Sequence, residues 1–106
     1  MMSWMQFRIR SKWLKANLQL VILSALRSQP MDKWELIDEI YSRSGLRPEE
    51  EELRSTLDQL IREGFVAAAI EKCQTRMHIN SLGLELLSRL ENLQQKRFAI
   101  RQAGRN

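Results

Sequence analysis

Side chains that could carry out catalysis or hold a metal ion are scarce in this sequence of 106 residues. It has one cysteine, Cys73, and one histidine, His78. A structural zinc site needs about four ligands of these two types, so none is expected. The sequence also has no glycine-rich phosphate loop and no nucleophile motif of the strand-to-helix type. We therefore predict that the chain is not an enzyme and has neither a cofactor nor a metal site.

Charged side chains offer the clearest chemistry, and the two signs are separated along the chain. Glu49, Glu50, Glu51 and Glu52 are consecutive, and from Glu49 to Glu63 six acids face two arginines. That segment therefore sums to −4, whereas the whole chain carries +4. Basic side chains gather at the start of the chain, around residue 72 and at the end: Arg8, Arg10, Lys12, Lys15, Lys72, Arg76, Lys96, Arg97, Arg101 and Arg105.

Each of these two groups has two interpretations. Carboxylates in a first helical turn interact favourably with the helix dipole, by about 0.3 to 1 kcal/mol each. The run from Glu49 to Glu52 can equally form a surface that repels phosphate and binds a basic protein. The basic residues can serve solubility alone, or they can contact a nucleic-acid backbone through a turn and an N-terminal arm.

Length and composition predict one domain with a modest core, because the chain has 106 residues and is 43% hydrophobic. A domain of this size is steadier as an oligomer than alone. The longest apolar run, from Leu18 to Leu26, is far shorter than the roughly 20 residues of a membrane span, so we expect no membrane partner. A lone cysteine indicates a reducing, cytoplasmic compartment.

Apolar residues at three- and four-residue spacing predict the helices in the first half of the chain. The first helix runs from about Ser11 to Ser28 and stops before Pro30. Asp32 and Glu35 form a capping pair that opens a second helix, which closes at Gly45. The aromatic side chains near or on these stripes are expected to point inward: Trp13, Trp34 and Tyr41.

The second half of the chain predicts a helix, a two-stranded ribbon and another helix. Pro48 suits the first position of the third helix, and Gly64 ends it. The predicted strands are Phe65 to Ile70 and Arg76 to Ile79, with a polar turn between them. Asn80 or Ser81 can cap the last helix, which continues to about Gln95. This order is typical of the second half of a winged-helix module.

The expected architecture is mainly α with a small β-hairpin wing, a winged helix-turn-helix with a C-terminal dimerisation helix. Residues 1–10 form a basic N-terminal arm, residues 11–95 the winged-helix domain and residues 96–106 a basic, flexible tail. The last helix has a second apolar stripe, which predicts a homodimer through Leu86, Leu90 and Leu93.

Several segments, taken in order, resemble the PadR-type winged-helix transcriptional regulators. They are Leu14-Lys15-Ala16-Asn17-Leu18, Val21-Ile22-Leu23, Pro30-Met31-Asp32-Lys33-Trp34-Glu35-Leu36-Ile37, Leu60, Glu63-Gly64-Phe65-Val66 and Thr75-Arg76-Met77-His78-Ile79-Asn80-Ser81-Leu82-Gly83. The resemblance spans roughly residues 13–93. The sequence departs from the family at the start of the third helix, where Glu49 to Glu52 replace Ser-Pro-Gly-Thr-like residues and Arg54 replaces a tyrosine that faces DNA.

Two hypotheses of function follow. The first is a small dimeric DNA-binding transcriptional regulator whose third helix approaches the major groove of double-stranded DNA. The predicted DNA contacts are Lys12, Lys15, Arg54, Ser55, Lys72, Gln74 and Arg76. The alternative is a winged-helix protein-interaction module that binds a basic protein at Glu49, Glu50, Glu51 and Glu52, without sequence-specific DNA binding.

Overall fold

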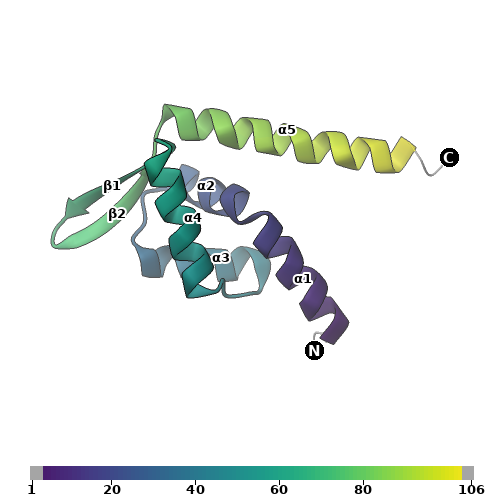
Figure 1. Cartoon of the computed structure of the whole chain (residues 1–106), viewed down its shortest axis with the longest axis horizontal. Coiled ribbons are helices and arrows are strands. Elements are labelled where there is room, and N and C mark those ends of the chain that lie inside the picture. Colours follow the sequence, from purple (N-terminus) through teal and green to yellow (C-terminus); the bar gives the residue numbers. More distant parts are fainter. Residues whose placement is uncertain (1–3, 104–106) are drawn as a thin grey trace.

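The computed structural model describes the backbone of residues 4–103 and the side chains of residues 5, 8 and 10–96. Over this range the elements are α1 (Trp4–Ala16), α2 (Leu18–Ser28), α3 (Lys33–Ser44), α4 (Glu50–Arg62), β1 (Val66–Glu71), β2 (Gln74–Ile79) and α5 (Ser81–Ala103). The β-hairpin projects from one side of the helices (Figure 1). The N-terminal part of α1 and the C-terminal part of α5 extend away on the other side.

The core is built around α2, which contacts α3, α4, α5 and β2. Ile22, Leu23 and Ala25 have no exposed surface, so α2 is covered on more than one side, as its surplus of leucines predicts. The surrounding elements each contribute buried side chains to this core: Leu36 and Ile40 from α3, Leu53, Leu57 and Leu60 from α4, Val66 and Met77 from the hairpin, and Leu87 from α5.

A break at Asn17 separates α1 from α2, because the backbone there leaves the helical conformation (φ −118°, ψ 19°). The Asn17 side-chain amide donates to the carbonyl oxygen of Trp13 at 2.8 Å, a local bond that competes with regular helix geometry. Its side-chain oxygen accepts from Nε2 of Gln94 on α5 at 2.9 Å. The predicted single helix from Ser11 to Ser28 is therefore wrong, since the helix begins at Trp4 and is divided in two.

The ends of α3 follow the sequence signals. The Asp32 carboxylate accepts from the Glu35 backbone N–H at 2.8 Å, and the Glu35 side chain accepts from the Asp32 N–H. This confirms the capping box. Gly45 ends the helix with a φ of +76°, and its N–H donates to the Tyr41 carbonyl.

The aromatic side chains expected to point inward are exposed: Trp13 by 46%, Trp34 by 67% and Tyr41 by 51%. Trp34 and Tyr41 lie seven residues apart on α3, beside the face that enters the core. Lys33 and Arg47 place their charges 5.1 and 5.6 Å from the centres of the two rings. These cation–π contacts explain how large rings are tolerated at the surface, and the prediction of burial is wrong.

The end of α4 is a Schellman motif. The Phe65 N–H donates to the Leu60 carbonyl at 2.9 Å, and the Gly64 N–H donates to the Ile61 carbonyl at 3.1 Å. Gly64 has a φ of +85°, the left-handed conformation that its position predicted. At the other end, α4 begins at Glu50, so Pro48 lies just before the helix rather than at its first position.

The hairpin is antiparallel and runs in register from Val66–Ile79 to Glu71–Gln74. Both predicted strands are confirmed, although they extend further toward the turn than expected. The connection consists of Lys72 (φ 49°) and Cys73 (φ 65°), which is the two-residue, type I′ pattern. At the base of the hairpin, Met77 exchanges two backbone hydrogen bonds with Met31 at 2.8 and 3.2 Å. This bridge fixes the hairpin to the segment between α2 and α3.

Asn80 and Gly83 join the hairpin to α5. The Asn80 side-chain oxygen accepts from the Gly83 N–H at 2.9 Å, which caps the helix as expected. Its amide group donates to the Gly64 carbonyl at 2.6 Å. Gly83 is buried, and a Cβ atom on it would lie 2.2 Å from the carbonyl oxygen of Phe65. Only a glycine allows the start of α5 to pack this closely on the end of α4.

Both chain ends are more helical than the sequence suggested. The arm expected over residues 1–10 belongs to α1 from Trp4 onward, and α5 continues through Ala103 although the tail was expected to start at residue 96. Residues 97–103 include two arginines, two alanines and a glutamine, which are good helix formers, and the stretch from Lys96 to Ala103 contains neither Pro nor Gly. Loss of apolar periodicity alone does not end a helix.

Candidate nucleic-acid interface

The exposed face of α4 is polar and nearly balanced in charge. A shallow hollow on it is lined by Glu51, Arg54, Ser55, Asp58, Gln59, Arg62 and Glu63. Arg54 and Ser55, the two residues predicted to approach DNA bases, are both exposed on this face. The Arg54 guanidinium pairs with the Glu51 carboxylate at 2.9 Å. Hydrogen-bond donors and acceptors therefore alternate along the surface that a DNA groove would meet.

The carboxylates in the first turn of α4 have cationic partners on different elements. Glu52 pairs with Lys15 of α1 at 3.0 Å, and Glu50 pairs with Lys33 of α3. The hydrogen bond from Lys33 and its positive charge lower the pKa of the Glu50 carboxyl. The hydrogen bond to Glu52 and its negative charge raise the pKa of the Lys15 ammonium. The charged forms of both groups are thus favoured, and the start of α4 is tied to α1 and α3.

Sequence reasoning did not find Lys33 as a residue of this site. Lys33 and Glu50 are 17 residues apart, and Lys15 is still further from Glu52. Opposite charges at such separations give no periodic signal, because only the fold, in which α1, α3 and α4 all contact α2, brings them together. Lys33 also lies over Trp34, so the same side chain contacts a carboxylate and an aromatic ring.

Basic residues form a stripe on one side of α1. Arg8, Lys12 and Lys15 are separated by four and three residues, a spacing that aligns them along a helix. All three are exposed, and the last of them reaches the first turn of α4. Arg8, which was predicted to lie in an N-terminal arm, is therefore on the same helix as Lys12 and Lys15.

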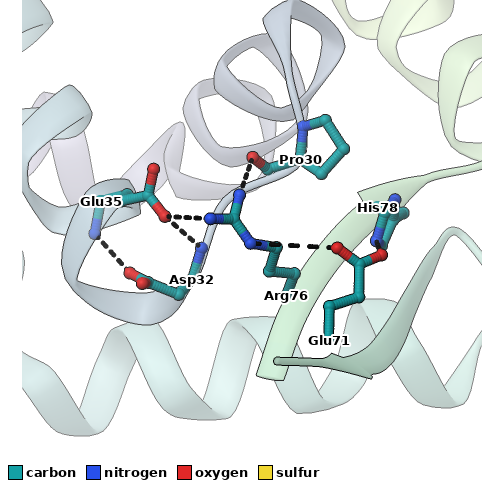
Figure 2. Close-up of polar contacts among 6 residues, drawn as sticks. All are labelled: Pro30, Asp32, Glu35, Glu71, Arg76 and His78. Atoms are coloured by element: carbon teal, nitrogen blue, oxygen red, sulfur yellow. Dashed lines mark hydrogen bonds and ion pairs between the residues drawn. The ribbon is translucent and has the colours of Figure 1, made fainter. Parts of the chain in front are cut away.

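The hairpin presents Lys72 and Gln74 to solvent at its tip, as expected for wing residues. Arg76 has a different environment (Figure 2). Its guanidinium lies 3.6 Å from Glu35, 3.9 Å from Glu71 and 3.5 Å from the Pro30 carbonyl oxygen. These contacts connect β2 to the capped start of α3. Arg76 therefore holds the wing against α3 in the isolated chain, a role that its sequence position did not suggest.

His78 extends the same network. Its Nε2 lies 3.0 Å from the Glu71 carboxylate on the facing strand (Figure 2). Glu71 thus lies between His78 and Arg76, and together with Glu35 it supplies the acceptors of this cluster. Within the described residues, no group of histidines, cysteines and acids could hold a metal ion.

The residues predicted to form a dimer interface divide between two environments. Leu86 and Leu90 are partly buried and pack against the core of their own chain. Leu93 is 51% exposed, and Leu82, on the same side of α5, is 52% exposed. Of the three predicted interface residues, Leu93 is therefore the exposed one, and Leu82 adds exposed apolar surface on the same side. The side chains of Arg97, Arg101 and Arg105 lie outside the described residues. Among the residues that the structure describes, no helix is both long and apolar enough to span a bilayer.

Comparison with solved structures identifies this arrangement as a winged helix. A transcriptional regulator from Clostridium thermocellum has a TM-score of 0.74 at 18% identity, over 86% of this chain and 93% of the other. A PadR family transcriptional regulator from Eggerthella lenta has a TM-score of 0.70 at 19% identity, over 90% and 80%. A winged-helix DNA-binding protein from STIV has a TM-score of 0.67 at 19% identity, over 73% and 86%.

At these identities the likeness establishes the fold, and it confirms the predicted winged-helix class. The structural neighbours include PadR-like regulators, the family that the sequence segments resemble. No protein-family model matches the sequence, and no curated protein matches it either.

Proposed function

We propose that this protein is a small, dimeric, PadR-like transcriptional regulator that binds double-stranded DNA. The observation that carries the proposal is the position of α4, whose polar exposed face lies beside the basic stripe of α1. The wing that follows α4 presents Lys72 at its tip. The structural neighbours are transcriptional regulators and DNA-binding proteins, which supports the same role. A non-enzymatic function and a cytoplasmic location belong to this proposal.

In the proposed complex, α4 enters the major groove with Arg54 and Ser55 toward the base edges. Lys12 and Lys15 of α1 contact phosphates on one side, and Lys72 and Gln74 of the wing contact them on the other. Arg76 contributes by keeping the wing in place, through its contacts to α3. Phosphate contacts supply most of the affinity of such a module, and the few base contacts supply its sequence preference.

We expect that replacing Lys12 and Lys72 together with alanine weakens binding to any duplex. Each lost phosphate contact lowers the slope of log K against log salt concentration by about 0.9, so the pair should lower it by about two. Fluorescence anisotropy with a labelled duplex measures both quantities. The matched control replaces Arg89 and Lys96, which are exposed on α5, with alanine. It removes the same charge from a part of the molecule outside the proposed interface. Equal losses for the two pairs would contradict the proposed interface.

The dimer is proposed to form through α5. Its exposed leucines, Leu82 and Leu93, lie on one side of a helix that extends beyond the rest of the domain (Figure 1). A second copy can bury that side, which gives two wings and two α4 helices related by symmetry. Such an arrangement would read two half-sites on one duplex.

A second candidate function is a protein-interaction module. The observation in its favour is the local charge of −4 from Glu49 to Glu63, which opposes phosphate. If α4 binds a basic protein, then Glu50→Gln with Glu51→Gln weakens capture of that protein, and duplex binding stays negligible at low salt. If α4 binds DNA, the same double substitution tightens duplex binding, because two negative charges near the phosphates are lost.

A further inference from the structure

Three consecutive carboxylates at the start of α4 each hold a cation from a different position in the chain. Glu50 holds Lys33 of α3, Glu51 holds Arg54 one turn along α4, and Glu52 holds Lys15 of α1. Two of these cations, Lys15 and Arg54, are residues that we assign to DNA contact. The third, Lys33, is the first residue of α3 and reaches the start of α4 through this ion pair. Each of these three acids at the proposed interface therefore forms an ion pair with a nearby cation.

We propose that the turn Glu50–Glu52 is an internal phosphate mimic that restrains DNA binding, because its carboxylates occupy cations at the surface where DNA would dock. The inference rests on the proposed function and adds a regulatory contact to the same surface. Carboxylate and phosphate oxygens make the same charge-assisted hydrogen bonds with lysine and arginine. A DNA duplex that docks on α4 must therefore displace the glutamates from these cations before it can contact them.

The exposure of the pairs makes this exchange possible. The Lys15 side chain is 74% exposed in its pair, and both members of the Arg54–Glu51 pair are at least 65% exposed. Ion pairs in such positions are weak, and salt screens them. The mimic therefore lowers affinity without blocking the site. A basic ligand that bound the glutamates would release these cations for contact with DNA.

Simple repulsion between glutamate and phosphate would also weaken DNA binding, so the two causes must be separated. Repulsion acts whether or not the partner cation is present. The proposed restraint, in contrast, acts only in a chain that has the partner cation, because the glutamate must form an ion pair with it. A double-mutant cycle on Glu52 and Lys15 distinguishes them, because Glu52→Gln frees Lys15 only in a chain that still has it.

The experiment measures binding of a labelled random-sequence duplex by anisotropy at about 50 mM salt, a concentration at which phosphate contacts are strong. The chains compared are wild type, Glu52→Gln, Lys15→Met and the double variant. We expect Glu52→Gln to tighten binding about two- to five-fold in the wild-type chain and to have little effect when Lys15 is methionine. The parallel cycle with Glu50→Gln and Lys33→Met is an independent repeat on the other side of α4.

Glu63→Gln is the matched control. Glu63 lies just after α4 and accepts a hydrogen bond from Gln59 Nε2 at 3.1 Å, so its replacement removes a negative charge without breaking an ion pair to Lys15 or Lys33. Thermal melts establish that each variant is folded. An equal gain from Glu52→Gln with and without Lys15 would overturn the mimic and leave the DNA-binding proposal standing. If neither wild type nor the variant with all three glutamates changed to glutamine binds duplex, both proposals are wrong.

Discussion

Gly83→Ala is expected to destabilise the domain by about 3 kcal/mol or more. The added Cβ would lie 2.2 Å from the backbone oxygen of Phe65 and 2.6 Å from Cγ1 of Ile79. A backbone oxygen cannot move away without shifting the end of α4 or the start of β1. Because a small domain has a total stability of roughly 5 to 15 kcal/mol, this change removes much of it. Urea denaturation followed by circular dichroism measures the loss.

Gly64→Ala is the matched control for this prediction. Gly64 has a positive φ of 85°, and a Cβ there meets no atom within 4 Å. Replacing Gly64 with alanine should therefore lower the free energy of unfolding by about 1 kcal/mol, the cost of a positive φ for a residue with a Cβ atom. The two variants separate steric conflict from backbone strain. An unfolding midpoint for Gly83→Ala equal to that of the wild type would show that α5 does not pack against Phe65 as described.

The second large effect is expected from Leu93→Glu, which should convert a dimer into a folded monomer. Leu93 is 51% exposed in the single chain, so a glutamate there is harmless to the protomer. In a dimer seam the same charge would be buried without a partner, which should weaken association by about 100-fold or more, about 2.7 kcal/mol. Light scattering combined with size-exclusion chromatography measures the mass of each species.

The choice of Leu93 rather than Leu90 matters for this test. Leu90 packs against the core of its own chain, so Leu90→Glu would unfold the protomer as well as disrupt a dimer. Leu84→Glu is a suitable control, because Leu84 is 44% exposed on another side of α5. If the wild-type chain is monomeric at concentrations of tens of micromolar, which is a practical loading range, the dimer proposal fails.

Local signals in the sequence predicted much of the fold. The Asp32–Glu35 capping box, the left-handed glycines at 45 and 64 and the cap at Asn80 were all found from residue types a few positions apart. Such signals are reliable because a helix end satisfies its backbone groups with side chains close in sequence. The hairpin was found in the same way, from an apolar segment on each side of a polar turn.

Features that depend on distant packing were missed. The break at Asn17 involves a bond to Gln94, 77 residues away. The exposure of Trp34 depends on a cation–π contact and on which α3 face meets α2, neither of which periodicity specifies. In the candidate site, Arg54, Ser55, Lys72 and Gln74 are exposed, which the predicted contact with DNA requires. The long-range partners of Lys15 and Arg76 were not predictable, because they come from elements that only the fold brings together.

The acidic start of α4 is the feature that most needed a structure for its interpretation. From sequence alone it stood against DNA binding, because four carboxylates would meet phosphate. In the structure, Glu50, Glu51 and Glu52 each neutralise a nearby cation. Lys15 and Lys33 lie outside the segment from Glu49 to Glu63, so counting them with it reduces the local charge from −4 to −2. The acidic residues alone therefore do not exclude a DNA-binding role.

The most direct test of that role is a titration of the wild-type chain with a random-sequence duplex at about 50 and about 200 mM salt, followed by fluorescence anisotropy. If Lys12, Lys15 and Lys72 each neutralise one phosphate, the proposed interface predicts a loss of affinity of roughly 40-fold between the two conditions. Absence of binding at the lower salt concentration, or an affinity that does not change with salt, would contradict the central claim.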